Sequence, residues 1–553
     1  MLAVDPALAQ RVAVVVALLG SLVAVAALDA RRSALAAHLR HRLILGLPWG
    51  TLLTAAGVLA VYLFVQGGAT NWAQPATIPF RAWSFLYPLG VVTAPFAHSG
   101  PNHLLGNLVG TLALAPLVEY AVGHYPRERG AHSFGSLRET PYARVLAVPA
   151  AAVGVGLLTG AFSLGPVIGF SGVVFAFAGA ALAVYPVRAV VALAATRVGT
   201  LAVSALRSPV TVATSEPTFA SPWWADVAIQ GHALGLLVGV LVGVWLGHRG
   251  VVERPTPLRA YAGVVLFGVS QSLWAVYWFR GEGEFVLYRA VGLTLVALLG
   301  LVVAGSVGAS ARPLAGAGPA GASLRSIPRW QAASVVLLVA FAALAGPGAA
   351  VNLATASDDP LPGEPLQVRD YEVTYAEDVE NGMVSVIDVE AFGETTNVET
   401  SGVIVRSRSR HAWLTAAPKS RLAFAGHAVV RVGGVGWQER VHVHRRGWNA
   451  VGGNSTYRIT FAHDNVTRVV YRAPPANASP TVDGRNVTIR TAPPRFRVAV
   501  THDNRTRSAP IPTENATTTV WGLTFTRDGR ALVATRNDTR VVVARAERYR
   551  GAG

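Results

Sequence analysis

Long apolar runs alternate with short polar segments over the first 350 residues of the chain. A helix that crosses a membrane needs about 20 mostly apolar residues. This measure predicts ten spans, at residues 11–29, 43–66, 103–123, 144–163, 167–185, 188–206, 226–247, 259–279, 284–306 and 330–350. The sixth carries Arg197 near its middle. Because a charge inside a membrane is costly, we expect this side chain to face the protein interior or a water-filled cavity, or to reach the membrane surface.

After residue 350 the pattern changes to short alternating stretches, such as "YRITFAH" and "FRVAVTH", separated by Gly, Asn and Pro. Alternation of this kind predicts a mostly β tail, either one sandwich or two small β units. The polar, Pro-containing segment that opens the tail is expected to keep it near the membrane but mobile. The chain thus divides into residues 1–42, 43–250, 251–350 and 351–553.

Composition supports the membrane interpretation, since 52% of residues are hydrophobic and only 14% are charged. The net charge of +17 could indicate nucleic-acid binding in a soluble protein, but much of the Arg lies in short loops between apolar runs. We therefore expect no nucleic-acid partner. The loops on one side carry most of these arginines, which predicts a multi-pass protein of the cell membrane with its tail outside the cytoplasm. The absence of Cys excludes disulfides, thiol catalysis and Cys-ligated metals.

The tail also contains seven N-x-S/T sequons, which are acceptor sequences for N-glycosylation and agree with an extracytoplasmic placement. Their asparagines are Asn454, Asn465, Asn477, Asn486, Asn504, Asn515 and Asn537. The alternative is that sequons arise by chance in a β region rich in Thr and Asn.

Four polar residues interrupt the apolar spans: Ser171, His232, His103 and Asn107. All four fall in the same half of spans that run in the same direction, so Ser171 and His232 can meet as a nucleophile and its base. His103 and Asn107 are four residues apart and share one helix face, where their N–H groups can converge on an oxyanion. The alternative for each residue is a simple hydrogen bond to a neighbouring backbone.

Small residues predict that two of these spans pack closely. In the seventh span a glycine recurs every fourth residue, and this series includes Gly235 and Gly239. The fifth span offers Gly172, Ala176 and Gly179 as its own small face. Close approach of these two faces would bring the Ser171 hydroxyl within reach of His232.

The stretches "HSGPNHLLGN", "GFSG" and "HALGLLVG" fall at the third, fifth and seventh predicted spans, in that order. In this order they resemble the rhomboid family of intramembrane serine proteases, in a prokaryotic form with extra transmembrane helices and a C-terminal extracellular domain. The resemblance implies a polytopic α-helical membrane protein. Its rhomboid-like six-helix core would lie within residues 43–250, with one helix before it, three after it, and a mostly β extracytoplasmic domain at the end.

The resemblance also implies roles for individual residues. Ser171 would be the nucleophile and His232 its base, while Asn107, His103 and the Ser171 N–H would bind the oxyanion. Gly169 and Gly172 flank the serine, Phe175 would pack on the imidazole of His232, and Glu119 would be a structural carboxylate. No metal and no organic cofactor is implied. One departure concerns the first long loop, where the family often has Trp-Arg and this chain has Arg81 and Trp83.

The expected activity is cleavage of transmembrane or membrane-anchored proteins within the lipid bilayer, near its outer face. Helix 188–206 and the loop 207–225 are the expected gate and cap for substrate. Two alternatives remain open: an inactive rhomboid-like scaffold that binds membrane clients, and a transporter that uses the histidines and Asn107 as a polar path. The sequence assigns no oligomeric state.

Overall fold

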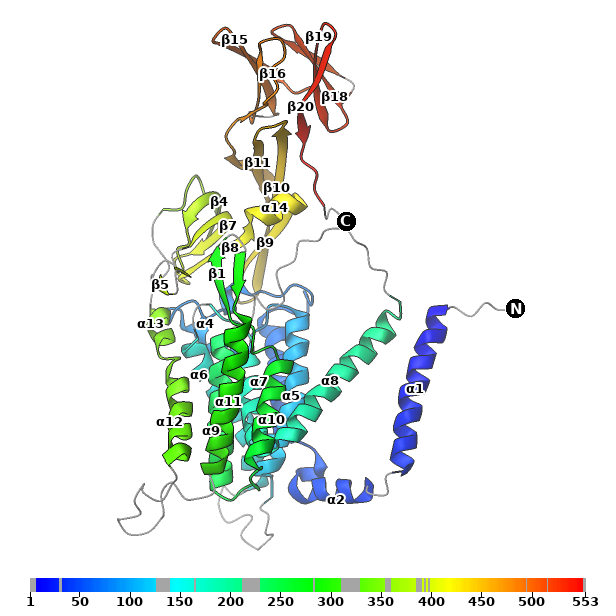
Figure 1. Ribbon diagram of the computed structural model, residues 1–553, viewed down its shortest axis with the longest axis vertical. Helices are drawn as coiled ribbons and strands as arrows, with labels where there is room; N and C mark the ends of the chain where they lie inside the picture. Colours follow the sequence, from blue (N-terminus) through cyan, green and yellow to red (C-terminus); the bar gives the residue numbers. More distant parts are fainter. Residues whose placement is uncertain are drawn as a thin grey trace, which may run out of the picture.

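The structure is a computed structural model of the 553-residue chain, shown in Figure 1. It describes residues 6–28, 32–125, 140–163, 166–210, 229–281, 284–309, 329–353, 360–383, 390–391, 394–395, 398–493, 495–514 and 516–550. Helices fill the first part of the chain, and strands fill the part after residue 360.

A helix stands at each of the ten positions where the apolar runs predict a span. They are α1 (Pro6–Leu28), α3 (Trp49–Ala60, continued by the π-helical turn η2, Val61–Val65), α5 (Pro101–Val122), α6 (Pro141–Ala161), α7 (Ser171–Val184), α8 (Pro186–Arg207), α9 (Ile229–His248), α10 (Pro257–Ser270), α11 (Arg289–Ala309) and α12 (Arg329–Ala343). Among the described residues six helical stretches are long and apolar enough to cross a membrane, and four others are apolar but shorter. The chain is a multi-pass membrane protein.

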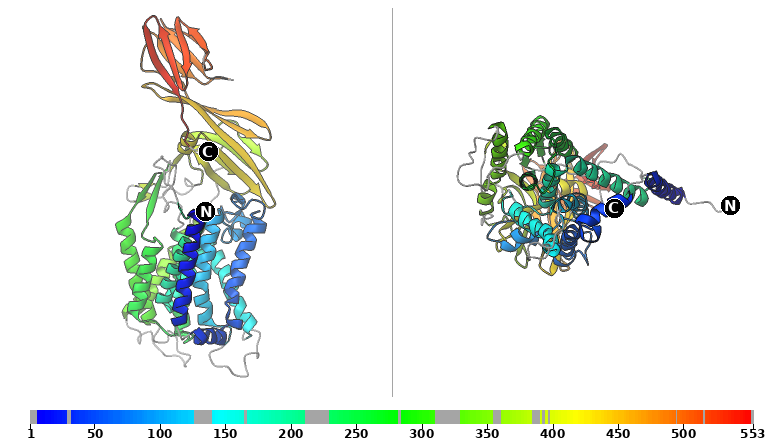
Figure 2. Two further views of the ribbon diagram at one scale, coloured as in Figure 1. Left: turned by 90° about the vertical axis from the view of Figure 1, so that its right-hand side faces the viewer. Right: turned by 90° about the horizontal axis from the view of Figure 1, so that it is seen from below.

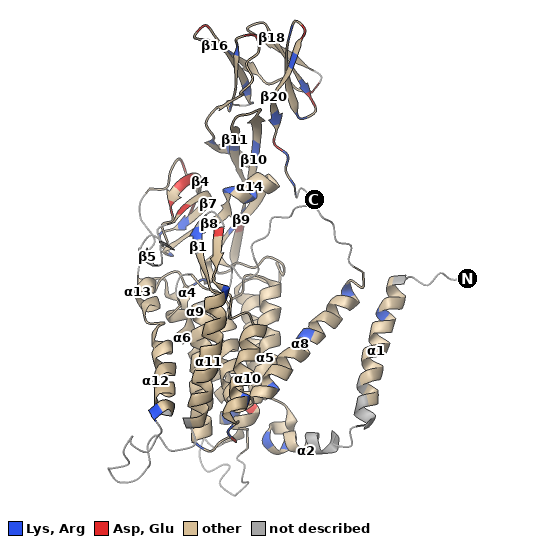
Figure 3. Ribbon diagram, in the orientation of Figure 1, with Lys and Arg blue, Asp and Glu red and all other residues tan. Residues whose placement is uncertain are grey.

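Short elements connect these helices. They are α2 (Arg32–Arg42), η1 (Ile44–Gly46), η3 (Ile78–Phe80), α4 (Pro88–Thr93) and α13 (Pro347–Leu353). Seen from the side and from below, α1 lies at the margin of the bundle (Figure 2), where it packs against α8. Charged side chains are sparse along the helices, and many lie near helix ends and in the strands (Figure 3).

Several predicted boundaries are wrong. The fifth span begins as a helix only at Ser171, because residues 166–170 are not helical and Gly169 has a φ of +134°. The eighth ends at Ser270, and the aromatic segment after it forms a hairpin of β1 (Tyr277–Gly281) and β2 (Glu284–Leu287), so the ninth helix starts later than predicted. In the tenth, α12 ends at Ala343 and a new helix starts at Pro347, because proline cannot continue the hydrogen bonding of the preceding helix.

The core of the bundle lies between α7 and α9, which approach each other at their glycines. A Cβ at Gly179 would lie 2.1 Å from the Leu236 carbonyl oxygen, which is far inside contact distance. Around this seam pack buried aliphatic and aromatic side chains, among them Leu114, Phe177 and Val240. Because the hydrophobic effect does not drive helices together in lipid, close van der Waals packing at these glycines stabilises the α7–α9 pair.

Glu119, at the far end of α5, ties that helix to the start of α3. Its buried carboxylate accepts hydrogen bonds from the backbone N–H of Gly50 at 2.7 Å and of Thr51 at 2.8 Å, and it lies 2.6 Å from His124 Nε2. The carboxylate therefore satisfies N–H groups that a helix start leaves unpaired and complements the helix dipole. This is the structural position that the family resemblance implies.

The C-terminal part is mostly β, as predicted, and forms two stacked units. The unit nearer the helices packs a four-stranded sheet, ordered β3-β4-β7-β8, against β9–β12 around one core. Its strands are β3 (Leu366–Val368), β4 (Tyr371–Glu380), β7 (Glu399–Ser407), β8 (Ala412–Pro418), β9 (His427–Gly434), β10 (Trp437–Ala450), β11 (Ser455–His463) and β12 (Val466–Arg472), with α14 (Lys419–Ala425) before β9. The short pair β5 (Glu390–Ala391) and β6 (Glu394–Thr395) lies between β4 and β7 in sequence.

The unit at the tip packs a second sheet, ordered β13-β14-β15-β16, against β17–β20. Its strands are β13 (Ala476–Asn477), β14 (Asn486–Arg490), β15 (Arg497–His502), β16 (Arg505–Pro510), β17 (Thr517–Val520), β18 (Leu523–Asp528), β19 (Ala531–Arg536) and β20 (Thr539–Ala546). The long strand β10 pairs with β9 along its first part and with β20 at its end, so one strand joins both units.

The β region packs directly on the helix bundle, so the expectation of a mobile tail is wrong. Ile78 and Trp83, from the loop between α3 and α4, belong to the same hydrophobic core as Tyr371 and Val405 of the β region. Arg410 Nη1 donates to Tyr87 Oη at 2.7 Å, which links the β region to the same loop. Since Trp83 is 1% exposed, the interface is a shared core and not a loose contact.

Candidate active site

Ser171 is the first residue of α7. Gly169, two residues earlier, has a φ of +134°, a conformation that side chains disfavour, and its N–H donates to Ala94 O at 2.9 Å. The chain thus turns sharply and enters the helix at the serine. The first N–H groups of a helix have no partner within it, so the Ser171 N–H stands beside its own hydroxyl at the positive end of the helix.

His232 meets Ser171 from the first turn of α9. The Ser171 Oγ lies 2.6 Å from His232 Nε2. On the other side of the imidazole, the ring of Phe175 stacks at 4.3 Å between centroids and 6° between planes. His232 Nδ1 is buried, with no hydrogen-bond partner among the described residues. The imidazole is therefore oriented by stacking and by the serine, and no carboxylate of the described residues hydrogen-bonds to its Nδ1.

The helix seam explains why these two side chains meet. A Cβ at Gly235 would lie 2.0 Å from the carbonyl oxygen of Gly172, and a Cβ at Gly239 would lie 2.0 Å from that of Ala176. Gly172 follows Ser171 directly, and Gly235 lies three residues after His232. One of these close backbone approaches of α7 and α9 therefore lies beside the serine and the histidine.

Asn107 and His103 reach the same place from α5. The Asn107 Nδ2 is buried and has no hydrogen-bond partner among the described residues. His103 packs on Gly169 so tightly that a Cβ there would lie 2.5 Å from its Cε1 and 2.7 Å from its Nε2. Its Nδ1 lies 3.0 Å from Ser99 Oγ. Two nitrogen-bearing side chains thus lie on the α5 side of the turn that leads into Ser171.

His98 and Gln66 support this arrangement. His98 is the first residue of the stretch "HSGPNHLLGN", but its role was not predicted from the sequence, and neither was that of Gln66. The side-chain amide of Gln66 pairs with the backbone of His98, accepting from its N–H at 2.7 Å and donating to its carbonyl at 2.8 Å. The buried ring of His98 packs edge-on against His103 at 5.1 Å. The signal that could have indicated Gln66 is its position as a lone polar residue at the end of an apolar span.

A cavity of about 210 Å³ opens beside Ser171 between α5, α7, α8 and α10. It is mainly apolar, with Asn107, Arg197 and Gln271 among its polar lining residues. Arg197 lies at this cavity, one of the three positions expected for it, and hydrogen-bonds to the Ser270 carbonyl. α8 is the least buried of the six long apolar stretches and leans away from the bundle toward its C-terminal end (Figure 1). The expected cap, loop 207–225, lies mostly outside the described residues.

The sequons lie far from this site, on the β region. The six described asparagines are all exposed, and Asn515 lies outside the described residues. Three of them, Asn465, Asn504 and Asn537, occupy tight hairpin turns at positive φ. Asparagine tolerates that conformation better than most residues, so turn geometry alone explains these three.

One group of side chains on the β region has metal-ligand spacing. Glu439, His463 and Asp464 place one ligand atom each within 4.8 Å of one another. Glu439 also pairs with Arg369 at 2.7 Å, and the Asp464 side chain is 84% exposed. Ion pairing accounts for these residues without a metal, and they do not approach Ser171.

Comparison with known families identifies part of the bundle. The family model described as Rhomboid domain matches residues 86–249, from just before α4 to the end of α9. The chain contains a rhomboid domain. The predicted resemblance to the rhomboid family is thereby confirmed over residues 86–249, a range that includes Ser171, His232, Asn107 and His103. Neither the curated proteins nor the solved structures gave a match. The match begins later than the predicted core of 43–250, and that division of the chain stays a prediction.

Proposed function

We propose that this rhomboid protein is an intramembrane serine endopeptidase with a Ser171–His232 dyad. The observation that carries the proposal is the 2.6 Å separation of Ser171 Oγ and His232 Nε2, at a cavity that the unpartnered Asn107 amide also lines. Intramembrane polar groups are costly and mark functional sites by default. A serine hydroxyl beside an imidazole is the arrangement that activates a nucleophile.

The chemistry follows from these positions. The hydroxyl of Ser171 attacks the carbonyl carbon of the scissile peptide, and His232 Nε2 takes the hydroxyl proton. Collapse of the tetrahedral intermediate breaks the C–N bond, and the imidazolium returns this proton to the leaving amine. Water then hydrolyses the acyl-serine with the same imidazole as base. Stacking on Phe175 keeps Nε2 directed at the serine throughout.

The oxyanion of the intermediate needs donors aimed at the place where its charge develops. The Ser171 N–H at the start of α7 and the Asn107 amide meet this need, since Asn107 Nδ2 has no other partner among the described residues. His103, packed against Gly169, contributes a third donor if its Nε2 carries the proton. In this proposal Gly169 must be a glycine because a side chain at position 169 would displace His103.

Substrate would enter from the lipid between α5 and α8, where the cavity beside Ser171 extends to Arg197 and Gln271. The substrates are then transmembrane or membrane-anchored proteins. The arginine-rich loops favour a cytoplasmic location for the opposite end of the bundle, so cleavage would occur near the outer face and the β region would be extracytoplasmic.

The test is cleavage of a generic transmembrane substrate by the full chain in liposomes. Ser171→Ala and His232→Ala should each lower the rate by several orders of magnitude, and the double variant should be little worse, because the pair acts as one unit. Ser306→Ala is the matched control, since this buried serine in α11 donates only to the Val302 carbonyl, at 2.8 Å. Activity that survives Ser171→Ala would refute the serine mechanism. A fully inactive wild type would favour the scaffold instead.

A further inference from the structure

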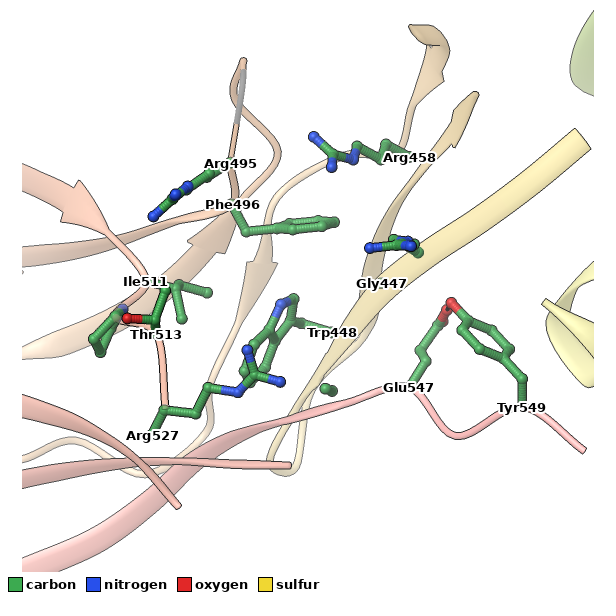
Figure 4. Close-up of a pocket in the computed structure, with 13 residues that line it drawn as sticks. Gly447, Trp448, Arg458, Arg495, Phe496, Ile511, Thr513, Arg527, Glu547 and Tyr549 are labelled. Atoms are coloured by element: carbon green, nitrogen blue, oxygen red, sulfur yellow. Dashed lines mark hydrogen bonds between the residues drawn. The ribbon is translucent and has the colours of Figure 1, made fainter. Parts of the chain in front are cut away.

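A second site lies where the two units of the β region join. Figure 4 shows a pocket of about 560 Å³ whose lining includes four arginines and three aromatic residues. Tyr549 follows β20, and the other six come from strands β10, β11 and β18 and from the segment before β15. We call this the arginine pocket and define it by Arg446, Arg458, Arg495, Arg527, Trp448 and Phe496.

Three of the arginines near this pocket stand side by side across a sheet. Arg446 of β10 pairs in register with Arg458 of β11, and Arg458 pairs with Arg472 of β12. Like charges placed directly opposite one another destabilise a sheet. Burial together with the neighbouring Arg446 and Arg472 lowers the pKa of Arg458. A bound anion would relieve this repulsion.

The acidic residue that lines the pocket does not neutralise it. Glu547 is already engaged by Arg445, whose Nη2 and Nε donate to the carboxylate at 2.7 and 3.0 Å, and by the Tyr549 hydroxyl at 2.7 Å. In the part of the chain that the structure describes, no carboxylate lies within ion-pair distance of Arg446, Arg495 or Arg527. The pocket therefore presents a net positive potential.

Arginines lie over two of the three aromatic rings in the pocket, which makes ligands that bind by ring stacking less favourable. Arg458 lies over the ring of Phe496 at 5.4 Å, and Arg527 lies over Trp448 at 5.7 Å. Trp448 is only 6% exposed. Nucleic-acid bases stack on free aromatic faces, whereas a carboxylate can bind a guanidinium group through two parallel hydrogen bonds.

We propose that the arginine pocket binds an acidic polypeptide segment through its carboxylates. The same face of the sheet extends this site toward the helices. Along β10 its exposed positions are Arg446, His444, His442 and Arg440, and Arg431 of β9 pairs with Arg440. Arg440 Nη2 also lies 3.5 Å from Asn71 Oδ1 in the loop next to the bundle.

The seven residues from Arg440 to Arg446 span roughly 20 Å of extended strand. A segment bound in the pocket could therefore run along this basic face to the helix bundle. Such binding would recruit clients that carry an acidic stretch next to their membrane anchor. This recruiting use rests on the proposed protease function, whereas the binding itself does not.

The experiment measures binding without catalysis. A fluorescein-labelled peptide rich in Asp and Glu is titrated with the full chain carrying Ser171→Ala, and its anisotropy is read at low and moderate salt. The peptide should bind, and affinity should fall as salt rises. Adding Arg446→Gln and Arg527→Gln should weaken binding about tenfold. The matched control, Arg490→Gln with Arg505→Gln, removes two exposed arginines of the tip sheet and should change affinity less than twofold.

A second experiment adds a photoreactive acidic peptide to the chain in which no arginine is substituted. Its result does not depend on whether the arginine variants fold. The peptide should crosslink to the segments that carry Trp448 and Phe496. The proposal is overturned if the acidic peptide does not bind, if the control pair loses as much affinity as the pocket pair, or if crosslinks fall elsewhere. It is also overturned if a sulfated oligosaccharide or an oligonucleotide binds the pocket more tightly than the peptide. Loss of protease activity alone leaves all these results unchanged.

Discussion

The glycine seam between α7 and α9 makes a quantitative prediction through Gly235→Ala. The new Cβ would lie 2.0 Å from the Gly172 carbonyl oxygen, and contacts below 3.0 Å essentially do not occur, so the helices must separate by roughly 1 Å. Because Gly172 follows Ser171 and Gly235 lies one turn after His232, this displacement falls on their 2.6 Å contact. A misplacement of about 1 Å costs on the order of 100-fold in rate.

The assay compares the rate of substrate cleavage with the melting temperature of the same sample. Gly154→Ala is the first control: no described neighbour outside its own helix backbone lies within 4 Å of the added methyl group, so activity should be unchanged and the helix slightly more stable. Gly243→Ala is the second, since its Cβ would overlap Ala183 in the same seam, roughly 16 Å along the helix from His232. It should lower stability more than rate. Activity of Gly235→Ala within twofold of the native chain at full occupancy would refute the assigned geometry.

Three further predictions concern single residues. Asn107→Ala should reduce turnover about 100-fold with little change in melting temperature, since it removes one oxyanion donor; loss of folding with intact specific activity would make the residue structural. Trp83→Ala should lower the free energy of unfolding by about 3–5 kcal/mol, because the ring lies in the core shared with the β region, while the exposed Trp330 should tolerate the same change in denaturation experiments. Arg410 holds the pKa of Asp370 below its usual range, so the stability from this pair should be fully present above about pH 4 and be lost as the pH falls through the depressed pKa. Asp370→Asn should remove that dependence in thermal melts between pH 3 and 6, and an unchanged profile would contradict it.

The helices and the site residues were predictable because their signals are local. Twenty apolar residues have few alternatives to a membrane helix, and glycines four residues apart define a packing face whatever surrounds them. Ser171, His232 and Asn107 stood out because a polar side chain in an apolar span has few structural explanations. Their spacing sufficed to predict that they could meet, and the structure brings them together.

Other features depended on contacts distant in sequence. Nothing near Trp83 indicates that it belongs to the core of a β region that begins about 280 residues later, so the sequence predicted a mobile tail. This contact with the β region also explains how the loop can be supported although it carries Arg81 and Trp83 in place of the Trp-Arg pair that is common in the family. The hairpin at Tyr277–Leu287 was mistaken for parts of two helices, because its aromatic residues are as apolar as those of a span. The arginine ladder is invisible in sequence, since register alone aligns Arg446, Arg458 and Arg472.

The most direct test of a catalytic Ser171 is labelling of the purified chain with a fluorophosphonate probe, followed by identification of the modified residue by peptide mass spectrometry. The account predicts one covalent adduct on Ser171, absent in Ser171→Ala, strongly slowed in His232→Ala and unchanged in Ser306→Ala. An adduct on another residue, or no adduct in a folded native chain, would contradict it.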